Sequence, residues 1–305
     1  MKHLILINSF AGKAKDIENI VKRDFEGLDY SVYVSEKPRS VINYLKGYFD
    51  KENKETVRVY ACGGDGTLHE VVNGLVGVKN AELALYACGT GNDFAKVYGG
   101  RNENKFLDFK KLQTWKASPI DLSKIEGASL NEPWYSINVV NFGFDAIVGA
   151  KGNENKLRGK KNPYGFTQAI VPALIRGRFN KTIVIADGKQ LNEKKLLLSS
   201  ISQGQFVGGE YMCSPKSNNE DGLMDVTVMK CMSLMRLLIQ YFSKYHDGLM
   251  NDNPKLMKRV VYTRAKEAII KAPKDIDICV DGEMIRGKEF KVTCLPGAIN
   301  FVKPE

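Results

Sequence analysis

The sequence predicts two domains, an α/β domain with a mostly parallel sheet followed by a β-sandwich. Over about the first hundred residues, strand-like runs alternate with helical patterns, which is typical of a parallel sheet covered on both faces. After about Trp115, runs of β-branched and aromatic residues follow one another with few helical patterns between them, as in a sandwich. The 305 residues are enough for two hydrophobic cores of ordinary size.

In the first domain, the strands and helices are expected in strict alternation. The expected strands are His3–Asn8, Tyr30–Ser35, Thr56–Cys62 and Glu82–Ala87. Helical spacing of apolar residues predicts helices around Ile17–Leu28, Val41–Phe49 and Leu68–Leu75, and a short helix over Asn92–Tyr98. Ligands bind at the carboxyl ends of such strands, so the loops that follow them are the first candidates for a site.

In the second domain, which is expected to begin near residue 118, one helix interrupts a series of strands. The helix is expected over Leu234–Tyr245. The expected strands are Trp134–Val140, Thr182–Ala186, Lys195–Ser202, Met224–Met229, Ala268–Ala272, Ile276–Val280 and Phe290–Cys294.

The composition is that of a folded globular protein, with 43% apolar and 26% charged residues. No apolar run approaches the roughly 18 residues that a membrane span needs, and the apolar start turns polar at Asn8, too early for a signal peptide. We therefore expect a cytoplasmic protein. The six cysteines form no C-x-x-C pair and only three histidines are present, so buried thiols are favoured over a zinc site.

Basic residues are concentrated in two segments of a chain with a net charge of +10. Residues 151–181 contain eight Lys or Arg and one acid, and residues 255–274 contain seven and one. An anionic membrane or a nucleic acid would explain this pattern, and a solvated surface explains it equally well.

The strongest motif is Cys62-Gly63-Gly64-Asp65-Gly66-Thr67, between an expected strand and an expected helix. Glycines let backbone N–H groups approach a phosphate, and the helix N-terminus adds a positive dipole. A bare carboxylate at Asp65 would repel phosphate, but a Mg²⁺ ion that bridges the two removes the conflict. The alternative is a glycine-rich turn in which Asp65 or Thr67 caps the helix.

A second loop repeats this arrangement after the next strand, as Gly89-Thr90-Gly91-Asn92-Asp93. The segment Asn8–Lys13 ends the first strand in a similar way. Two phosphate-type loops with one acid each predict a single Mg²⁺–nucleotide site, with Asp65 and Asp93 holding the ion through water. The chain contains neither G-x-x-x-x-G-K-[ST] nor G-x-G-x-x-G, which argues against P-loop and dinucleotide-binding proteins.

These loops resemble the diacylglycerol kinase catalytic domain family, which includes bacterial soluble diacylglycerol kinases, related phospholipid kinases and sphingosine kinases. The resemblance continues in order through Gly143–Ala146, Gly208–Gly209, Asp221–Asp225, Val280–Glu283 and Pro296–Ala298. It implies a phosphofructokinase-like, Rossmann-type three-layer domain over residues 1–117 and a β-sandwich over residues 118–289. It also implies a C-terminal tail, residues 290–305, that returns to the first domain.

The resemblance implies ATP as the phosphoryl donor and assigns roles to particular residues. The nucleotide contacts that it implies are Asn8, Ser35, Gly64, Asp65, Gly66, Thr67, Leu68, His69, Glu70 and Thr90. It places a second, structural Mg²⁺ at Asn218, Asp221 and the carbonyl of Leu223, and the catalytic carboxylates at Asp281 and Glu283.

Two of these assignments have an alternative in the residues themselves. Asn218–Asp225 does not match the calcium loop of an EF-hand and by itself indicates a polar turn. Asp281-Gly282 is also a hairpin-turn signal, although such a turn can present a base as well. The departures from the family pattern are Ser9 for Pro, Ser35 for Thr, and His69 and Gln203 for Asn, of which the last two leave the substrate more open.

The predicted reaction is transfer of the γ-phosphate of ATP to a lipid hydroxyl, with diacylglycerol as the first candidate acceptor. A carboxylate of the Asp281/Glu283 pair would take the hydroxyl proton. The alternatives are an NAD kinase-like or other soluble-substrate kinase, and a nucleotide- or lipid-binding homologue without turnover. The expected partners are the lipid and an anionic membrane surface that the enzyme reaches peripherally from the cytoplasm. No nucleic acid is expected, and a homodimer is left open.

Overall fold

The computed structural model describes residues 1–9, 14–50, 55–100, 105–144, 146–147, 180–193, 195–209, 211–231 and 258–304. It contains two compact units, which are Met1–Leu122 together with Pro296–Glu305, and Ser123–Leu295. The sequence places the corresponding limits at residues 117 and 290, a few residues earlier in each case.

The first unit is built on a parallel sheet. Its strands are β1 (Lys2–Asn8), β2 (Tyr30–Ser35), β3 (Val57–Gly63) and β4 (Ala81–Ala87), in the order β4-β3-β1-β2. The end of β16 (Glu283–Val302) adds a further parallel strand, because Asn300 and Phe301 pair with Glu82 and Leu83 of β4. The N–H of Gly297 also donates to the Asp121 carboxylate at 2.8 Å, so the C-terminal tail is bound within this unit.

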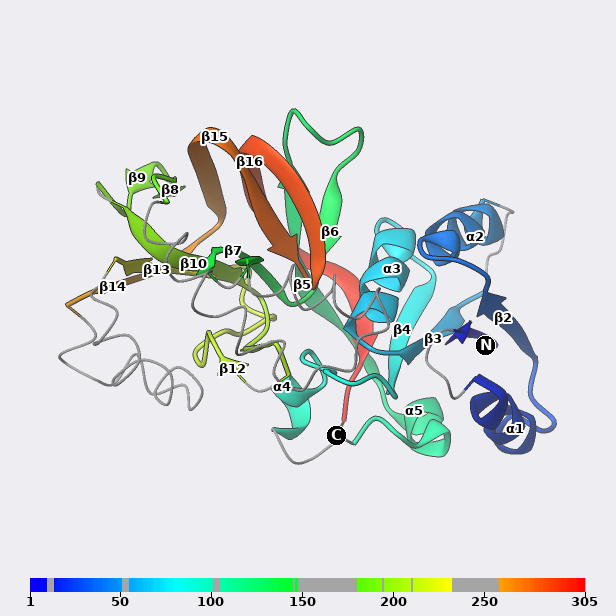
Figure 1. The fold of residues 1–305 in the computed structure, drawn as a ribbon. Coiled ribbons are helices and arrows are strands. Elements are labelled where there is room, and N and C mark those ends of the chain that lie inside the picture. Colours follow the sequence, from blue (N-terminus) through cyan, green and yellow to red (C-terminus); the bar gives the residue numbers. More distant parts are fainter. Residues whose placement is uncertain are drawn as a thin grey trace, which may run out of the picture. The chain divides into compact units, whose positions relative to one another are not determined.

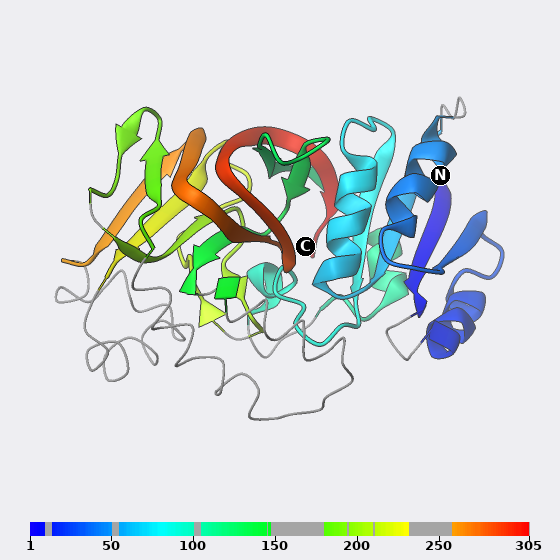
Figure 2. The same cartoon turned by 45° about the horizontal axis from the view of Figure 1, so that its top comes forward.

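Helices cover both faces of this sheet (Figures 1 and 2). They are α1 (Ala14–Asp24), α2 (Ser40–Phe49), α3 (Asp65–Leu75), α4 (Lys96–Gly99) and α5 (Phe109–Thr114). In Figure 1, α2 and α3 lie on one face and α1 and α5 on the other, so the predicted three-layer arrangement is confirmed. All seven residues of β3 are buried, as expected for a strand covered on both sides.

The second unit is a sandwich of antiparallel strands. The main sheet has the order β14-β13-β10-β7-β15-β16. Its strands are β7 (Val139–Gly143), β10 (Leu196–Ser202), β13 (Met224–Lys230), β14 (Val260–Ala265), β15 (Glu267–Val280) and the first part of β16. The remaining strands are β6 (Trp134–Ser136), β8 (Ile183–Ala186), β9 (Lys189–Gln190), β11 (Phe206–Val207) and β12 (Tyr211–Met212). β5 (Ala117–Glu126) leads from the first unit into the second.

Strand β15 pairs with β16 and also with two further strands, β8 and β7. Its first half pairs with β8, through Ala268–Lys271, and its second half pairs with β7, through Ile278–Val280. A register shift between Lys271 and Ile276 separates the two halves. The apolar core between the strands includes Val140, Phe142, Val226, Ile278 and Phe290, and the predicted β-sandwich is confirmed.

Several elements differ from their sequence-based expectation. The helix expected over Asn92–Tyr98 begins only at Lys96, because Asn92 adopts a left-handed conformation with φ of 51°. The strand expected over Trp134–Val140 is interrupted at Ile137 and Asn138, where side-chain hydrogen bonds replace strand pairing. β5, β14 and α5 were not predicted from the sequence, and the expected helix Leu234–Tyr245 lies outside the described residues.

The strand expected over Phe290–Cys294 is much longer in the structure, where β16 spans Glu283–Val302, and the short strands β9, β11 and β12 were not predicted. The other strand boundaries agree with their expectation to within one residue. Ala268–Ala272 and Ile276–Val280, expected as two strands, are parts of the single strand β15. In the part of the chain that the structure describes, we find no helix with the length and apolar character that a membrane span requires.

Candidate active site

The two glycine loops of the first unit are in direct contact. The N–H groups of Cys88 and Gly89 both donate to the carbonyl of Gly63, at 3.0 and 3.2 Å. A Cβ atom on Gly89 would lie 2.3 Å from the Cα of Gly64, which real contacts do not allow. Only glycine therefore fits at Gly89, and the two loops form a cradle in which they touch through their backbones, an arrangement suited to the close approach of a phosphate.

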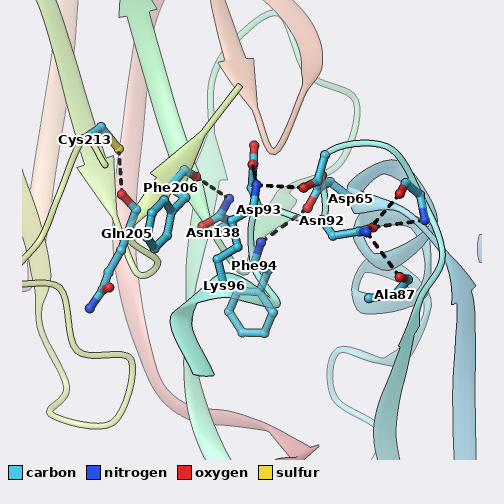
Figure 3. A network of polar contacts seen from close by, with 12 residues as sticks. Asp65, Ala87, Asn92, Asp93, Phe94, Lys96, Asn138, Gln205, Phe206 and Cys213 are labelled. Carbon is cyan, nitrogen blue, oxygen red and sulfur yellow. Dashed lines mark hydrogen bonds and ion pairs between the residues drawn. The ribbon is translucent and has the colours of Figure 1, made fainter. Parts of the chain in front are cut away.

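Asn92 fixes the shape of the second loop (Figure 3). Its Oδ1 accepts from the N–H of Gly89 at 3.0 Å, and its Nδ2 donates to the carbonyls of Ala87 and Gly89 at 3.2 and 2.9 Å. Asn92 has a left-handed backbone conformation, which asparagine adopts more readily than most residues. The backbone of the loop therefore explains why an asparagine stands here.

The carboxylates of Asp65 and Asp93 both lie close to Gly91, beside this cradle. A Cβ atom on Gly91 would lie 2.8 Å from Asp65 Oδ2 and 3.9 Å from Asp93 Oδ1. The Asp65 carboxylate also accepts from the backbone N–H of Phe94 at 3.4 Å, which ties the start of α3 to the second loop (Figure 3). Lys96 lies next to the pair, because its Nζ is 3.1 Å from Asp93 Oδ1 and donates to the Gly91 carbonyl at 2.8 Å.

The electrostatics of this pair favour a bound cation. Burial, followed by the negative charge of Asp93, raises the pKa of Asp65 to about 6. Two carboxylates at one point carry more negative charge than the single Lys96 ammonium compensates. Oxygen ligands with excess negative charge suit Mg²⁺, so the residues present fit the ion that the sequence predicts at Asp65 and Asp93.

The ends of the first three strands bring further predicted nucleotide contacts to the same edge of the sheet. Asn8 Nδ2 donates to Thr67 Oγ1 at 2.8 Å, and the N–H of Ser9 donates to Ser35 Oγ at 3.4 Å. Glu70 Oε1 accepts from the N–H of Arg39 at 2.9 Å.

The other predicted contacts fall into two groups. Gly66 and Thr90 are exposed, whereas the side chains of Leu68 and His69 are buried in the packing of α3. Any nucleotide contact at Leu68 or His69 would therefore use the backbone. Residues 10–13, which complete the first loop, lie outside the described residues.

In the second unit, Asp281 and Gly282 form the turn between β15 and β16. Both have positive φ, 50° and 99°, and the flanking residues Val280 and Glu283 pair with each other. This is the two-residue hairpin turn that the Asp-Gly signal predicts, so the turn is confirmed. The side chain of Glu283 is exposed at the start of β16.

The Asp281 carboxylate is surrounded by hydrogen-bond donors from the segment that joins β6 to β7. Ser136 Oγ donates to its Oδ1 at 2.6 Å, and the N–H groups of Asn138 and Val139 donate to the same oxygen at 3.1 and 3.0 Å. The N–H of Ile137 donates to Oδ2 at 3.0 Å. Asp281 is only 8% exposed, so these contacts replace its water and hold the segment in place.

The segment held by Asp281 supports a second loop. The carbonyl of Asn138 accepts from the N–H groups of Gln203 and Gly204 at 2.8 and 2.9 Å, and its Nδ2 donates to the carbonyl of Phe206 at 3.0 Å (Figure 3). Gln203 Nε2 also donates to Cys294 Sγ at 3.4 Å. The loop that leads to the predicted Gly208–Gly209 motif is therefore positioned through Asp281.

The two side chains of the expected second Mg²⁺ site, Asn218 and Asp221, make polar contacts within the protein. Asn218 Oδ1 accepts from the N–H of Glu220 and Asp221 Oδ1 accepts from the N–H of Leu223, both at 3.1 Å. The other Asp221 oxygen pairs with the guanidinium of Arg264.

The comparison with family models identifies both halves of the chain. Residues 2–125 match the diacylglycerol kinase catalytic domain, and residues 138–303 match the YegS C-terminal NAD kinase beta sandwich-like domain. The chain belongs to the family of proteins with a YegS C-terminal domain, which covers more than half of it, and its first part is a diacylglycerol kinase catalytic domain. It is therefore a member of a family of kinases, and ATP is the substrate that this family implies.

The individual relatives have low sequence identity to this chain, but each alignment covers most of both proteins. It is 26% identical over 254 residues to a diacylglycerol kinase of Mycobacterium tuberculosis, covering 82% of this chain and 78% of that protein. It is 26% identical to a diacylglycerol kinase of Bacillus subtilis, covering 74% and 70%. A structure described as a diacylglycerol kinase from Bacillus anthracis shares the fold with a TM-score of 0.68 at 20% identity, over 99% and 97% of the two chains.

Sequence reasoning missed four functional contributors to these sites. They are Lys96, Asn92, the Ser136–Val139 segment and Arg264. Lys96 could have been found as the cation three residues after Asp93, in a segment where the sequence predicts a helix. The other contacts join residues far apart in the sequence, such as Ser136 and Asp281, and no local pattern indicates them.

Proposed function

We propose that this protein is an ATP-dependent lipid kinase that transfers the γ-phosphate of ATP to the hydroxyl of diacylglycerol, with phosphatidic acid as the product. The observation that carries the proposal is the pair of glycine loops in contact at Gly63 and Gly89, with Asp65 and Asp93 beside them. Relatives named as diacylglycerol kinases support the choice of acceptor.

The nucleotide would be bound by the loops of the first unit. The first turn of α3, at Asp65–Thr67, would offer backbone N–H groups to the phosphates, and Asn8, Thr67 and Ser35 contribute side chains at the same edge of the sheet. A Mg²⁺ held by Asp65 and Asp93 would neutralise charge on the transferring phosphoryl group. Lys96 keeps the Gly91–Asp93 part of the loop in place.

Within the Asp281/Glu283 pair, we assign the general base to Glu283. Both oxygens of Asp281 already accept hydrogen bonds from the Ser136–Val139 segment, so this carboxylate is a positioning residue. Glu283 follows directly after the rigid turn and is exposed, so it can take the proton of an acceptor hydroxyl.

An anionic membrane surface is the proposed partner, reached peripherally from the cytoplasm. Most of the basic segment 151–181 lies outside the described residues, whereas six basic residues of the segment 255–274 are described: Lys258, Arg259, Arg264, Lys266, Lys271 and Lys274. Each well-placed basic side chain contributes about 1 kcal/mol of attraction to such a surface. Sedimentation with anionic vesicles should weaken as salt rises, and salt-independent binding would contradict a charge-driven attachment.

The activity test uses labelled ATP with a panel of acceptors that includes diacylglycerol, monoacylglycerol, phosphatidylglycerol, sphingosine, undecaprenol and NAD. Label in phosphatidic acid is the expected result. Label in NADP instead would favour a soluble-substrate kinase, and ATP consumption with no acceptor labelled would favour a homologue without lipid turnover.

The variant Glu283→Gln tests the assignment of the base. We expect kcat to fall by about 10²- to 10⁴-fold while the affinity for ATP and the unfolding midpoint stay close to wild type. Glu289→Gln, on the same strand and in a surface pair with Lys271, is the matched control and should keep full activity. Near-normal kcat in Glu283→Gln would reject Glu283 as the base.

A further inference from the structure

The turn from Asn218 to Leu223 is closed by its own backbone and by one arginine. Its two polar side chains, Asn218 and Asp221, each accept an N–H from two residues further along the chain. The remaining Asp221 oxygen pairs with Arg264 of β14, which is 42% exposed, whereas the Asp221 side chain is 24% exposed. A positive charge is therefore already present at this carboxylate.

Arg264 also faces a second, fully buried acid. In the antiparallel pairing of β13 with β14, Arg264 lies directly opposite Asp225, and Thr227 lies opposite Tyr262. Asp225 is 1% exposed and accepts from the Tyr262 hydroxyl. The Arg264 guanidinium therefore pairs with the carboxylate of the turn and acts electrostatically on the carboxylate of the strand.

Magnesium and arginine compete for this place on chemical grounds. Mg²⁺ requires six oxygen ligands in a near-ideal octahedron, and Arg264 already occupies one of the two Asp221 oxygens. Arginine remains charged at every physiological pH and has five donors in a planar fork, so it can pair with a carboxylate and still serve a second one.

We propose that Arg264 supplies the positive charge at the Asn218–Leu223 turn in place of the second Mg²⁺ that family resemblance assigns there. The turn then keeps its shape without a metal ion, and a chelator that removes divalent cations does not change its contribution to stability.

The pair between Arg264 and Asp221 also affects a neighbouring loop of the second unit. Ser217, just before the turn, accepts through its carbonyl from Gln205 Nε2 at 3.2 Å, and the N–H of Ser214 donates to the Gln205 carbonyl at 3.2 Å. Residues 214–217 therefore hold Gln205, in the loop that leads to Gly208–Gly209. Arg264 stabilises this loop by fixing the turn that follows those residues.

The experiment measures thermal unfolding in chelator and in millimolar Mg²⁺, with all proteins in an Asp65→Asn background so that the ion cannot act through the nucleotide loops. Asp221→Asn should lower the midpoint by about 2–4 °C, equally in both solutions. The proposal is overturned if Mg²⁺ raises the midpoint of the background protein and Asp221→Asn removes that rise.

Two further measurements decide the same question independently. In chelator, Asp221→Asn and Arg264→Gln should be non-additive, because each removes the same pair, whereas additive shifts would contradict the pairing. The background protein should bind no Mn²⁺ at this turn. The proposal is refuted if the background protein binds one Mn²⁺ ion per chain and Asp221→Asn abolishes that binding. Arg286→Gln, which removes a surface pair with Asp277 on the neighbouring strands, is the matched control for loss of an arginine.

Discussion

Asp65-Gly66 and Asp281-Gly282 are the same dipeptide in two different settings. Asp65 opens α3 at the end of a parallel strand, accepts a backbone N–H from Phe94 and borders a second acid, Asp93. Asp281 opens a hairpin turn, and its carboxylate accepts four hydrogen bonds from one connecting segment, Ser136–Val139.

The difference separates an acid that attracts a ligand from an acid that organises the chain. The ionised form of a carboxylate is destabilised by a second carboxylate nearby, and a bound cation relieves this repulsion. Such an acid therefore favours the binding of a cation. A carboxylate surrounded by backbone donors is already stabilised, and removing it leaves buried N–H groups without partners. Three predictions test this contrast.

The largest effect is expected at Asp65. Asp65→Asn should reduce kcat by about 10²- to 10³-fold, because the charge that binds the ion is lost, with little loss of stability. The measurement is steady-state kinetics together with thermal unfolding. Asp16→Asn, which also changes an acid in the first turn of a helix, serves as the control and should leave kcat unchanged. Near-normal turnover in Asp65→Asn would remove Asp65 from the metal site.

Asp281 should behave in the opposite way. Asp281→Asn should lower the free energy of unfolding by about 2–4 kcal/mol, because charge-assisted hydrogen bonds to buried N–H groups are weakened. Urea denaturation measures this loss. Asp277→Asn, at a half-exposed position on the strand that leads into this turn, should change it by less than about 0.5 kcal/mol. If Asp281→Asn keeps full stability and loses only kcat, Asp281 is a base and the contrast fails.

The smallest effect concerns pH. The pKa of Asp65 is raised to about 6 in the folded protein, chiefly by burial, against about 3.9 in an unfolded chain. A raised carboxyl pKa stabilises the fold at low pH, and this contribution is lost as the pH rises from about 4 to about 6.

Urea titrations of the metal-free protein measure this directly. Asp65→Asn cannot ionise, so it should gain stability relative to wild type across that pH range and show a constant difference above it. Parallel stability curves for the two proteins would show that Asp65 titrates normally. Addition of Mg²⁺ should reduce the difference above pH 6, since the ion stabilises the ionised form.

Much of the architecture could be predicted because the relevant signals are local. β2 begins and ends where the alternating pattern places it, and α2 and α3 follow the apolar spacing around Val41 and Leu68. The hairpin at Asp281-Gly282 was also predictable, because both residues tolerate positive φ. The start of α4 could not be predicted in this way. The sequence predicts a helix from Asn92, but the left-handed conformation of Asn92 makes α4 begin only at Lys96.

The sequence by itself determined the fold class, the two glycine loops and the acids placed in them, because periodicity, turn residues and motif spacing are properties of neighbouring residues. Tertiary structure alone decided how the carboxylates are used. Asp281 meets Ser136 and Asp221 meets Arg264 across long stretches of chain. Whether a carboxylate binds a metal, a proton or the backbone depends on which charges and donors folding brings to it, and that information is absent from its local sequence.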